Sequence, residues 1–446
     1  MHSQLARLPS YFKYLTSLII ALASLWFFIL PGITASWYIA TDKGLNSSAD
    51  SAFLWNRHPA ISKQYAKYCR ERIDSEVAAS LTVDQLEATE WPLFGSVFYL
   101  WATENMQSSW EKNPSLSNQA PAIYAREAID SAKDLVLDPN HAKWVIDHYG
   151  KDQYLEHDNV FYRMLCMQAI ISHHNLTGET KHLPFLRDQV SKFTAELEAS
   201  PHGLLDDYPH QCYPTDVLAA IDAIKRADPI LGSDHSEFIK RAQRGFTGKL
   251  AAPNGLPAYS ANKNTGYRLD DSRGCSNSYM TTAAVTLWPA KAAQWYQTYR
   301  KDYWQAGWFA SGFREFPHDQ GYDYYQDIDS GPVLHGLGTA ATAFGMGAAR
   351  ANGDYGTAGS LAYQMIAASW PLPNGQLKFP QLFSKPEHSR HLGEVGILYQ
   401  LSHTPPANMN YNQTSKTSWS VYAMLAGYFI LGLPLLYISW RLIRKK

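Results

Sequence analysis

Residues 158–178 read DNVFYRMLCMQAIISHHNLTG, and this stretch decides the fold class. Its apolar side chains recur at the three- and four-residue spacing of an α-helix, and Gly178 marks a break. A second stretch with the same spacing follows almost at once, at residues 182–199. Because only a short turn joins the two stretches, we expect them to pack as an antiparallel pair of helices.

The same helical spacing recurs along most of the chain, whereas few stretches show the strict alternation of half-buried strands. No Gly/Ser linker divides residues 41–418, and no sequence repeat indicates a solenoid. The pattern therefore predicts an all-α fold, an (α/α)6 toroid or barrel in which paired helices form two concentric rings. We expect helices at residues 52–79, 93–106, 122–136, 159–176, 182–199, 216–227, 237–250, 279–299, 332–351, 355–369 and 394–402.

The composition of the 446 residues excludes several classes of protein. Lys and Arg number 39 and Asp and Glu 40, a net charge of -1, which argues against nucleic acid as a partner because phosphate binding needs concentrated positive charge. A hydrophobic share of 46% argues against disorder. The four cysteines lack CxxC spacing and no HExxH motif occurs, so we expect no metal and no cofactor.

Both ends of the chain are strongly apolar. Residues 14–40 and 419–440 contain no charged side chain, and each is long enough to cross ~30 Å of hydrocarbon as a helix. Aromatic residues near the ends, such as Trp37 and Trp419, suit the membrane interface. A cleavable signal peptide is the alternative for the first stretch, but its apolar region is ~7–15 residues long. The greater length favours an uncleaved anchor.

Positive charge near each apolar stretch predicts its orientation. Arg7 and Lys13 precede the first stretch, and a basic tail at residues 441–446 follows the second, so both ends are expected in the cytoplasm. We expect a bacterial inner-membrane protein whose main domain is periplasmic or extracellular. The predicted parts are a cytoplasmic N-terminus (1–13), a transmembrane helix (14–40), an extracytoplasmic (α/α)6 domain (41–418), a second transmembrane helix (419–440) and a cytoplasmic basic tail (441–446).

Three loops, at residues 200–215, 251–278 and 311–331, are much longer than the other connections, and long loops in compact domains are often functional. Each ends where an apolar helix is expected to begin, so in a toroid of alternating helices their ends open on one face. The loops share acids, tyrosines, and a histidine or arginine, as does the shorter segment at 152–159. We therefore expect them to form the wall of one pocket.

Carboxylates dominate the candidate site, and neighbouring carboxylates such as Asp206 and Asp207 raise one another's pKa when they lie close together. A protonated acid beside an ionised one is the arrangement of general acid/base catalysis. The candidate catalytic residues are Asp158, Asp207, Cys212, Asp271, Glu315 and Asp329. The candidate substrate-binding residues are His157, Tyr162, Tyr208, His210, Tyr279, Arg314 and Tyr325.

Several candidates have a structural alternative. Asp158, Asp271 and Asp329 stand close to expected helix starts, where Asp is a favoured N-cap. Cys212 and Cys275 each precede an expected inner helix, whose N-terminus lowers a thiol pKa, but in an oxidising compartment they are also candidates for a disulfide. The many aromatic side chains suit either sugar rings or the filling of a helical core.

The quoted stretch at 158–178 resembles a pocket helix of the linalool dehydratase/isomerase family. GLLDDYPHQC at residues 203–212 and SNSYMTTAAVTL at 276–287 are similar to further segments of that family, and residues 313–331 fall where it has an Arg-Glu loop. The resemblance covers residues 94–354 and implies an (α/α)6 barrel that acts as a carbon–oxygen lyase or isomerase.

The resemblance also implies that Cys212 is a pocket cysteine and Tyr279 a pocket tyrosine. The chain departs from the family at two positions: Asp206 and Asp207 stand in the loop of its other cysteine, and Leu165 stands in place of its pocket histidine. These differences predict a more polar pocket and a hydroxylated substrate.

Three functions follow from these observations. The first is a membrane-anchored acid/base lyase or isomerase of the linalool dehydratase type. The alternatives are a glycoside hydrolase or polysaccharide lyase acting on an envelope glycan, and a non-catalytic glycan-binding component of an envelope assembly. In each case the expected partners are a small-molecule or glycan substrate and the lipid bilayer, with oligomerisation left open. For an enzyme, we expect at least two of Asp158, Asp207, Asp271, Glu315 and Asp329 to face one pocket.

Overall fold

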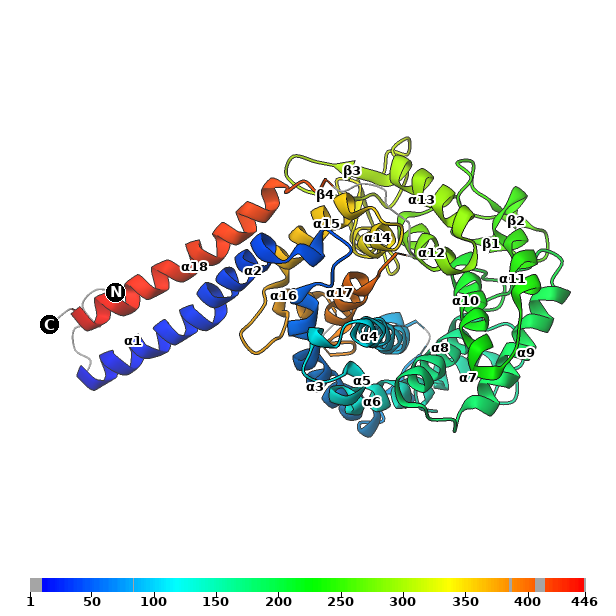
Figure 1. Ribbon diagram of the computed structural model, residues 1–446, viewed down its shortest axis with the longest axis horizontal. Helices are drawn as coiled ribbons and strands as arrows, with labels where there is room; N and C mark the ends of the chain where they lie inside the picture. The colour runs from blue at the N-terminus through cyan, green and yellow to red at the C-terminus, as the bar shows by residue number, and fades with distance from the viewer. Residues whose placement is uncertain (1–9, 83, 385–386, 406–413, 445–446) are drawn as a thin grey trace.

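The computed structural model describes residues 10–82, 84–384, 387–405 and 414–444. Helices dominate it, and its strands are few and short, which confirms the expected helical fold class. In Figure 1 a long helical hairpin, made from the two ends of the chain, projects from a rounded helical body.

Six helices of the body, here called the inner helices, contact one another in a closed cycle (Figure 1). Each packs against two others, and the last returns to the first. Further helices pack against the inner helices from outside. The inner helices are α4 (Leu86–Lys112), α8 (Val160–Thr177), α10 (Pro214–Leu231), α12 (Gly274–Leu287), α14 (Thr339–Ala351) and α17 (Leu392–Ser402). The outer helices include α3 (Ala52–Asp74), α6 (Arg126–Leu137), α9 (Leu183–Ala199), α13 (Pro289–Tyr303) and α15 (Tyr355–Ser369).

The inner helices are apolar on nearly every side because they are covered by outer helices and by one another. In α8 almost every side chain from Val160 to Leu176 is buried, and Gly178 ends the helix with a φ of 75° that suits glycine. The neighbouring α9 packs against α8, as the antiparallel pair predicted from the sequence requires. Shorter helices fill the remaining connections: α5 (Pro121–Tyr124), α7 (Lys143–Tyr149), α11 (Ser236–Ala242) and α16 (Lys378–Phe383).

Among the described residues, three small antiparallel sheets lie within or beside the second and third long loops. One pairs β1 with β2, one pairs β3 with β4, and the third has the order β5-β6-β7. In the third sheet Tyr324 lies opposite Leu334 and Asp327 opposite Gly331. The strands are β1 (Ala261–Asn262), β2 (Tyr267–Arg268), β3 (Trp304–Ala306), β4 (Ser311–Phe313), β5 (Tyr324–Asp327), β6 (Gly331–Leu334) and β7 (Leu337–Gly338).

Several expected helices differ in the structure: the one expected at 122–136 is divided at Ala125, and the one expected at 237–250 ends at Ala242. The helix expected at 332–351 begins only at Thr339, because Gly331 and Gly336 adopt φ values of 61° and 81° and turn the preceding residues into strands. The helix expected at 279–299 is two helices that meet at Trp288. Pro289 cannot continue the first because it lacks an N–H, and it opens the second instead.

Two helical stretches are long and apolar enough to cross a membrane, as the sequence predicts: Tyr11–Thr41 and Trp419–Arg444. The first comprises α1 (Ser10–Ser24), a π-helical turn (Leu25–Ile29) and α2 (Leu30–Thr41), and the second is α18 (Trp419–Arg444). They pack antiparallel, so the two ends of the described chain lie together (Figure 1). Residues 1–9 and 445–446, which include Arg7 and part of the basic tail, lie outside the described residues.

Small and hydroxylated residues hold this hairpin together. Ser17 Oγ donates a hydrogen bond to the carbonyl of Ser439 over 2.8 Å, and Ser24 Oγ donates to the carbonyl of Gly432 over 2.7 Å. At Gly32 an added Cβ would lie 2.7 Å from Cβ of Tyr428, so the two helices approach closely there. The contact pattern is that of small residues at membrane helix interfaces.

Gly32→Leu is expected to separate α2 from α18 and to destabilise the protein by about 1–3 kcal/mol, the usual cost of overpacking. Gly427→Leu is the matched control, because a Cβ at Gly427 meets no atom within 4 Å. Thermal unfolding of both variants in detergent measures the difference. Equal melting temperatures in the two variants would show that α2 and α18 do not pack closely at Gly32.

Candidate functional site

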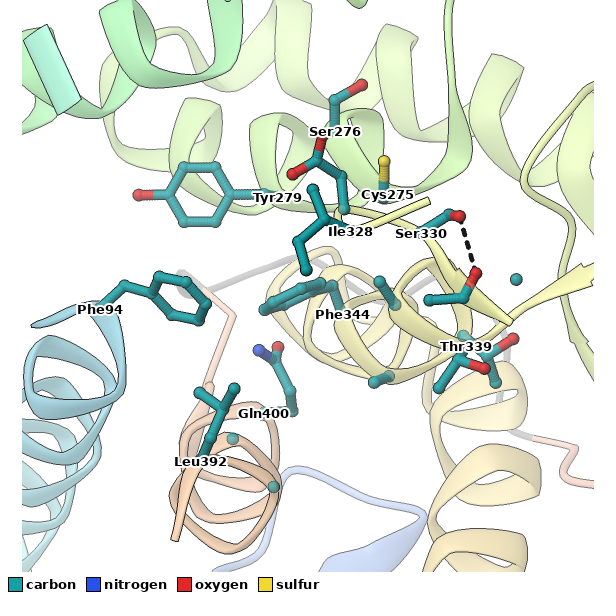
Figure 2. Close-up of a pocket in the computed structure, with 18 of the residues that line it drawn as sticks. Phe94, Cys275, Ser276, Tyr279, Ile328, Ser330, Thr339, Phe344, Leu392 and Gln400 are labelled. Atoms are coloured by element: carbon teal, nitrogen blue, oxygen red, sulfur yellow. Dashed lines mark hydrogen bonds between the residues drawn. The ribbon is translucent and has the colours of Figure 1, made fainter. Parts of the chain in front are cut away.

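A cavity of about 1910 Å³ lies inside the cycle of inner helices, and all six contribute to its wall. Residues of all three long loops line it as well. Figure 2 shows Phe94, Tyr279, Phe344 and Gln400 reaching from four different helices toward the same space. Most of the lining is apolar or aromatic, so the few polar groups in the cavity act in surroundings of low polarity.

Four of the five carboxyl groups that line this cavity lie close enough to interact electrostatically. Glu90 extends from α4 and Asp216 from the first turn of α10, whereas Asp207 lies in the loop before α10. Asp329 lies in the turn between β5 and β6. They come from parts of the chain that are far apart in sequence, and we call them the carboxyl cluster.

The surroundings of the carboxyl cluster favour protonated acids. Burial raises the pKa of Glu90 from 4.5 to about 7; the Asp329 charge adds to the rise, and a hydrogen bond from the Tyr208 hydroxyl opposes it. Burial, with the nearby charges of Glu90 and Asp329, raises the pKa of Asp216 from 3.8 to about 8. At neutral pH Asp216 is therefore mostly protonated and Glu90 is close to half ionised, as an acid/base pair requires.

Asp207 is buried behind these two groups and joins two inner helices. One of its carboxyl oxygens accepts a hydrogen bond from the Phe161 N–H and the other from the Tyr213 N–H, both over 3.0 Å. Phe161 belongs to the first turn of α8, and Tyr213 immediately precedes α10. Burial and the neighbouring Asp216 raise the pKa of Asp207 well above its usual value. Its contacts fit a residue that positions the ends of both helices.

Asp329 receives a hydrogen bond from the hydroxyl of Tyr259, a residue of the second long loop. The protein around the cavity raises the pKa of Asp329, although the carboxyl remains open to the cavity itself. The guanidinium of Arg273 lies over the Tyr259 ring, 4.2 Å from its centroid. This stacking contact places the ring beside the cavity.

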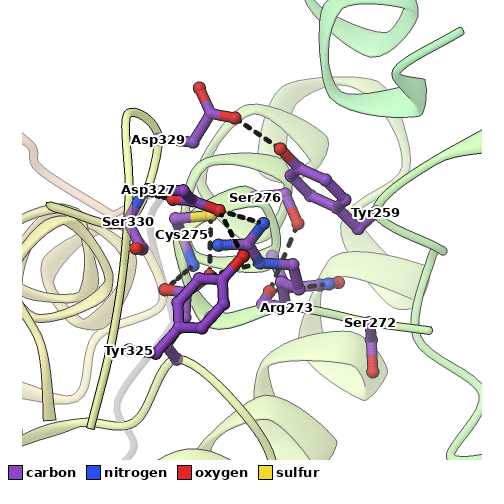
Figure 3. A network of polar contacts seen from close by, with 12 residues as sticks. Tyr259, Ser272, Arg273, Cys275, Ser276, Tyr325, Asp327, Asp329 and Ser330 are labelled. Atoms are coloured by element: carbon purple, nitrogen blue, oxygen red, sulfur yellow. Dashed lines mark hydrogen bonds and ion pairs between the residues drawn. The ribbon is translucent and has the colours of Figure 1, made fainter. Parts of the chain in front are cut away.

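Arg273 is the centre of a polar network directly behind the cavity wall (Figure 3). Its Nε lies 2.7 Å from Oε1 of Glu315, and a terminal nitrogen lies 2.8 Å from Oδ2 of Asp327. The Cys275 thiol, which lines the cavity, donates to Oε1 of Glu315 over 3.0 Å, and the Tyr325 hydroxyl donates to Asp327 over 2.9 Å. Glu315 therefore supports the wall without lining the cavity.

The four cysteines are free thiols in the structure. Burial and the Asp207 charge raise the pKa of Cys212, and burial and the Glu315 charge raise the pKa of Cys275. The expectation of a lowered thiol pKa at these helix starts is wrong, because burial and neighbouring acids outweigh the helix dipole. Cys212 does not line the cavity.

Glu315→Gln is expected to lower the free energy of unfolding by about 3 kcal/mol, because it leaves the buried Arg273 without its closest counter-charge. The comparison variant is Asp271→Asn, which removes an exposed ion pair with Arg268 and costs under about 1 kcal/mol. Urea unfolding in mild detergent, followed by tryptophan fluorescence, measures both values. A similar small loss in the two variants would contradict a supporting role for the buried pair.

The structure brings only part of the predicted site to the cavity. Among the candidates from the sequence, those that line it are Asp207, Tyr208, Tyr279 and Asp329. The candidates outside the lining are Asp158, Cys212, Asp271, Glu315, His157, Tyr162, His210, Arg314 and Tyr325. Of these, Glu315 and Tyr325 belong to the network behind Cys275.

The other candidates outside the lining have contacts of their own. Asp158 pairs with Lys263 over 2.6 Å, and its carboxylate also accepts from the Asp206 N–H rather than capping α8. Neither Asp271 nor Asp329 occupies an N-cap position either, so the capping alternative is wrong for all three aspartates. The remaining residues divide into exposed His157 and His210, and buried Tyr162 and Arg314.

Sequence reasoning missed Glu90, Asp216, Tyr259 and Gln400. Asp216 lies in the first turn of α10 and Glu90 is the fifth residue of α4; acids are common near helix starts for reasons unrelated to catalysis, so no local signal marks them. Gln400 is buried in α17, and its Nε2 donor has no hydrogen-bond partner among the described residues although the side chain faces the cavity (Figure 2). An unpaired donor in such a wall is suited to a ligand oxygen.

A second group of polar residues lies away from the cavity lining. Asp130, His173 and Glu179 offer ligand atoms within 4.8 Å of one another, and Arg126 forms ion pairs with both acids. That guanidinium already offsets part of the negative charge of the group, so the carboxyl cluster is the stronger candidate for chemistry. No protein-family model and no curated protein matches the chain. The functional conclusion therefore rests on the cavity and on its acids, which retain protons near neutral pH.

Proposed function

We propose that the chain is a membrane-anchored extracytoplasmic enzyme that cleaves a carbon–oxygen bond of a hydroxylated substrate by acid/base catalysis. The observation that carries this proposal is the carboxyl cluster: two acids with pKa values of about 7 and about 8 share one mainly apolar cavity. Within this class the resemblance to linalool dehydratase/isomerase favours a lyase or an isomerase.

The proposed reaction is an elimination that divides the work between Asp216 and Glu90. Protonated Asp216 donates its proton to the departing hydroxyl oxygen, the carbon–oxygen bond breaks, and its electron pair leaves with the oxygen as water. Ionised Glu90 takes a proton from the adjacent carbon, and the electrons of that carbon–hydrogen bond form the new double bond. The Tyr208 hydroxyl donates a hydrogen bond to the Glu90 carboxylate and so holds that carboxylate in place.

We also propose the finer architecture that goes with this function. The closed cycle of six inner helices with helices outside it supports an (α/α)6 toroid, the fold that the family resemblance implies. The antiparallel hairpin brings both chain ends to one side, where Arg441 and Arg444 favour the cytoplasm. These charges support a helical body outside the cytoplasm, which the hairpin anchors in a bacterial inner membrane.

The volume of the cavity favours a second candidate, a glycoside hydrolase or polysaccharide lyase. At about 1910 Å³ the cavity exceeds the ~300–1,000 Å³ of common small-molecule pockets, and its wall includes Trp91 and Trp101, whose faces suit sugar rings. Paired carboxyl groups are also the catalytic groups of glycosidases. A non-catalytic glycan-binding component would use the same aromatic wall but would not need the carboxyl cluster.

A product survey separates these functions. The full-length protein in detergent is incubated with linalool and other hydroxylated terpenes, and separately with envelope oligosaccharides, and products are identified by mass spectrometry. Loss of water from an intact terpene supports the proposed lyase, and cleavage of an oligosaccharide supports the second candidate. Glu90→Gln serves as the inactive reference for either reaction. Glycan binding without any product from either panel would overturn the enzymatic proposal.

A further inference from the structure

Two exposed aromatic side chains form part of the rim of the cavity. Trp308 is 79% exposed and Phe309 is 52% exposed, yet both line the cavity from the turn between β3 and β4. Their rings contact each other edge to face, 5.7 Å apart. Large aromatic side chains that are left in water at a cavity entrance indicate a surface that is covered by an apolar environment.

This rim is bonded directly to the candidate membrane helix α18. The Trp308 carbonyl accepts a hydrogen bond from the Trp419 N–H over 3.1 Å, and the Phe309 carbonyl accepts from the Ser420 N–H over 2.7 Å. Trp419 is the first residue of α18, and Figure 1 shows β3 and β4 beside that end of the helix. With Tyr422, Trp419 suits an aromatic belt, and such a belt would put the rim level with the membrane surface.

The cavity wall continues along the same side of the body. Gln364 and Ala368 of α15 line the cavity, and α15 packs against both α2 and α18 of the hairpin. Phe379 of α16 lines the cavity as well and is partly exposed. The space that contains the carboxyl cluster therefore extends to elements that adjoin the membrane helices, along an apolar path.

The polar groups in the cavity restrict the headgroup of any lipid that enters. Five acids, Asp84 and the carboxyl cluster, line the cavity, whereas no Lys or Arg appears among the described residues of its wall. A phosphate would meet repulsion there without a cationic partner. The unpaired Gln400 Nε2 donor instead suits a hydroxyl or ether oxygen.

We infer that the substrate is a membrane lipid with an uncharged, hydroxylated headgroup, which enters the cavity sideways from the bilayer past Trp308 and Phe309. The headgroup reaches the carboxyl cluster while the acyl chains follow the apolar wall toward the hairpin. The inference deepens the proposed function and rests on it for the chemistry at the headgroup.

Photolabelling tests the entry of such a lipid. The full-length protein is reconstituted in phosphatidylcholine vesicles that contain glucosyl diacylglycerol with a diazirine on one acyl chain, and labelled peptides are mapped by mass spectrometry. We expect label on α17, an inner helix, as well as on the hairpin. Phosphatidylglycerol with the same diazirine chain is expected to label α17 at least fivefold less. Label confined to the hairpin, or equal labelling of α17 by both lipids, would overturn the inference.

Variants at the rim provide the matched comparison. Trp308→Glu combined with Phe309→Glu is expected to lower α17 labelling at least fivefold, because the acyl chains would have to pass two charges. Trp37→Glu is the control: Trp37 is 64% exposed on the hairpin but does not line the cavity. An equal loss in both variants would show a general membrane effect and overturn the rim as the entrance.

Glu90→Gln separates the two proposals, because it removes the acid/base group and leaves the apolar path intact. It is expected to keep the wild-type labelling of α17. If α17 is labelled but turnover survives Glu90→Gln, the proposed catalysis fails and lipid entry stands. If soluble substrates are turned over with Glu90 dependence and α17 stays unlabelled, only the lipid inference fails.

Discussion

Asp216→Asn and Glu90→Gln are each expected to lower kcat for carbon–oxygen cleavage about 100-fold or more, since a positioned acid or base contributes about 10²–10⁴-fold. Both replacements keep the size of the side chain but cannot exchange a proton near neutral pH. The two groups share one cavity and act in the same step, and the Glu90 charge raises the pKa of Asp216, so we expect the double variant to lose less than the product of the two single losses. Steady-state kinetics on the substrate found in the product survey measure these losses.

Two exposed acids supply the controls for these variants. Asp147 lies on α7 in an ion pair with Lys143, and Glu237 lies on α11, so Asp147→Asn and Glu237→Gln make the same replacements outside the cavity lining. Both are expected to keep kcat within about twofold of the wild type, as is usual for remote surface changes. Retained turnover in Asp216→Asn and Glu90→Gln would remove the carboxyl cluster from the mechanism.

The helical part of the fold could be predicted because its signal is local. The spacing of apolar residues identifies helices such as α8 and α9, and a glycine or a proline marks many helix ends. The prediction failed at 332–338, where the chain has apolar residues but also Gly331 and Gly336, whose positive φ angles build a turn. Residue spacing alone does not show which of these two influences decides the local structure.

Apart from Tyr279 of α12, which the family resemblance predicted, the candidate site could be predicted only where its residues lie in long loops. Asp207, Tyr208 and Asp329 belong to loops whose length and composition are unusual, and the cavity includes all three. Glu90 and Asp216 lie 126 positions apart, and each alone resembles an ordinary acid near a helix start. They meet because α4, α8 and α10 are neighbours in the helix cycle, an arrangement that depends on long-range packing.

The carboxyl cluster is also expected to make the stability of the protein depend on pH, in the direction opposite to that of an ordinary ion-paired acid. The pKa of Glu90 is about 7 in the folded protein against 4.5 for the free group, so between these values the folded state binds more protons than the unfolded state. Stability therefore falls as pH rises through this window, and Asp216, with a pKa of about 8 against 3.8, extends the fall toward pH 8.

Glu90→Gln removes one of these titrations and should make the curve flatter. The rise in the pKa of Glu90 from 4.5 to about 7 corresponds to about 3 kcal/mol of folding free energy. Between pH 5 and pH 9 the wild type is therefore expected to lose about that much more stability than the variant. Urea unfolding in mild detergent across this range measures the difference, with Glu237→Gln expected to follow the wild type. Parallel curves for the wild type and Glu90→Gln would mean that Glu90 titrates alike in the folded and unfolded states. In that case Glu90 would not have the pKa near 7 that suits the base of the proposed elimination.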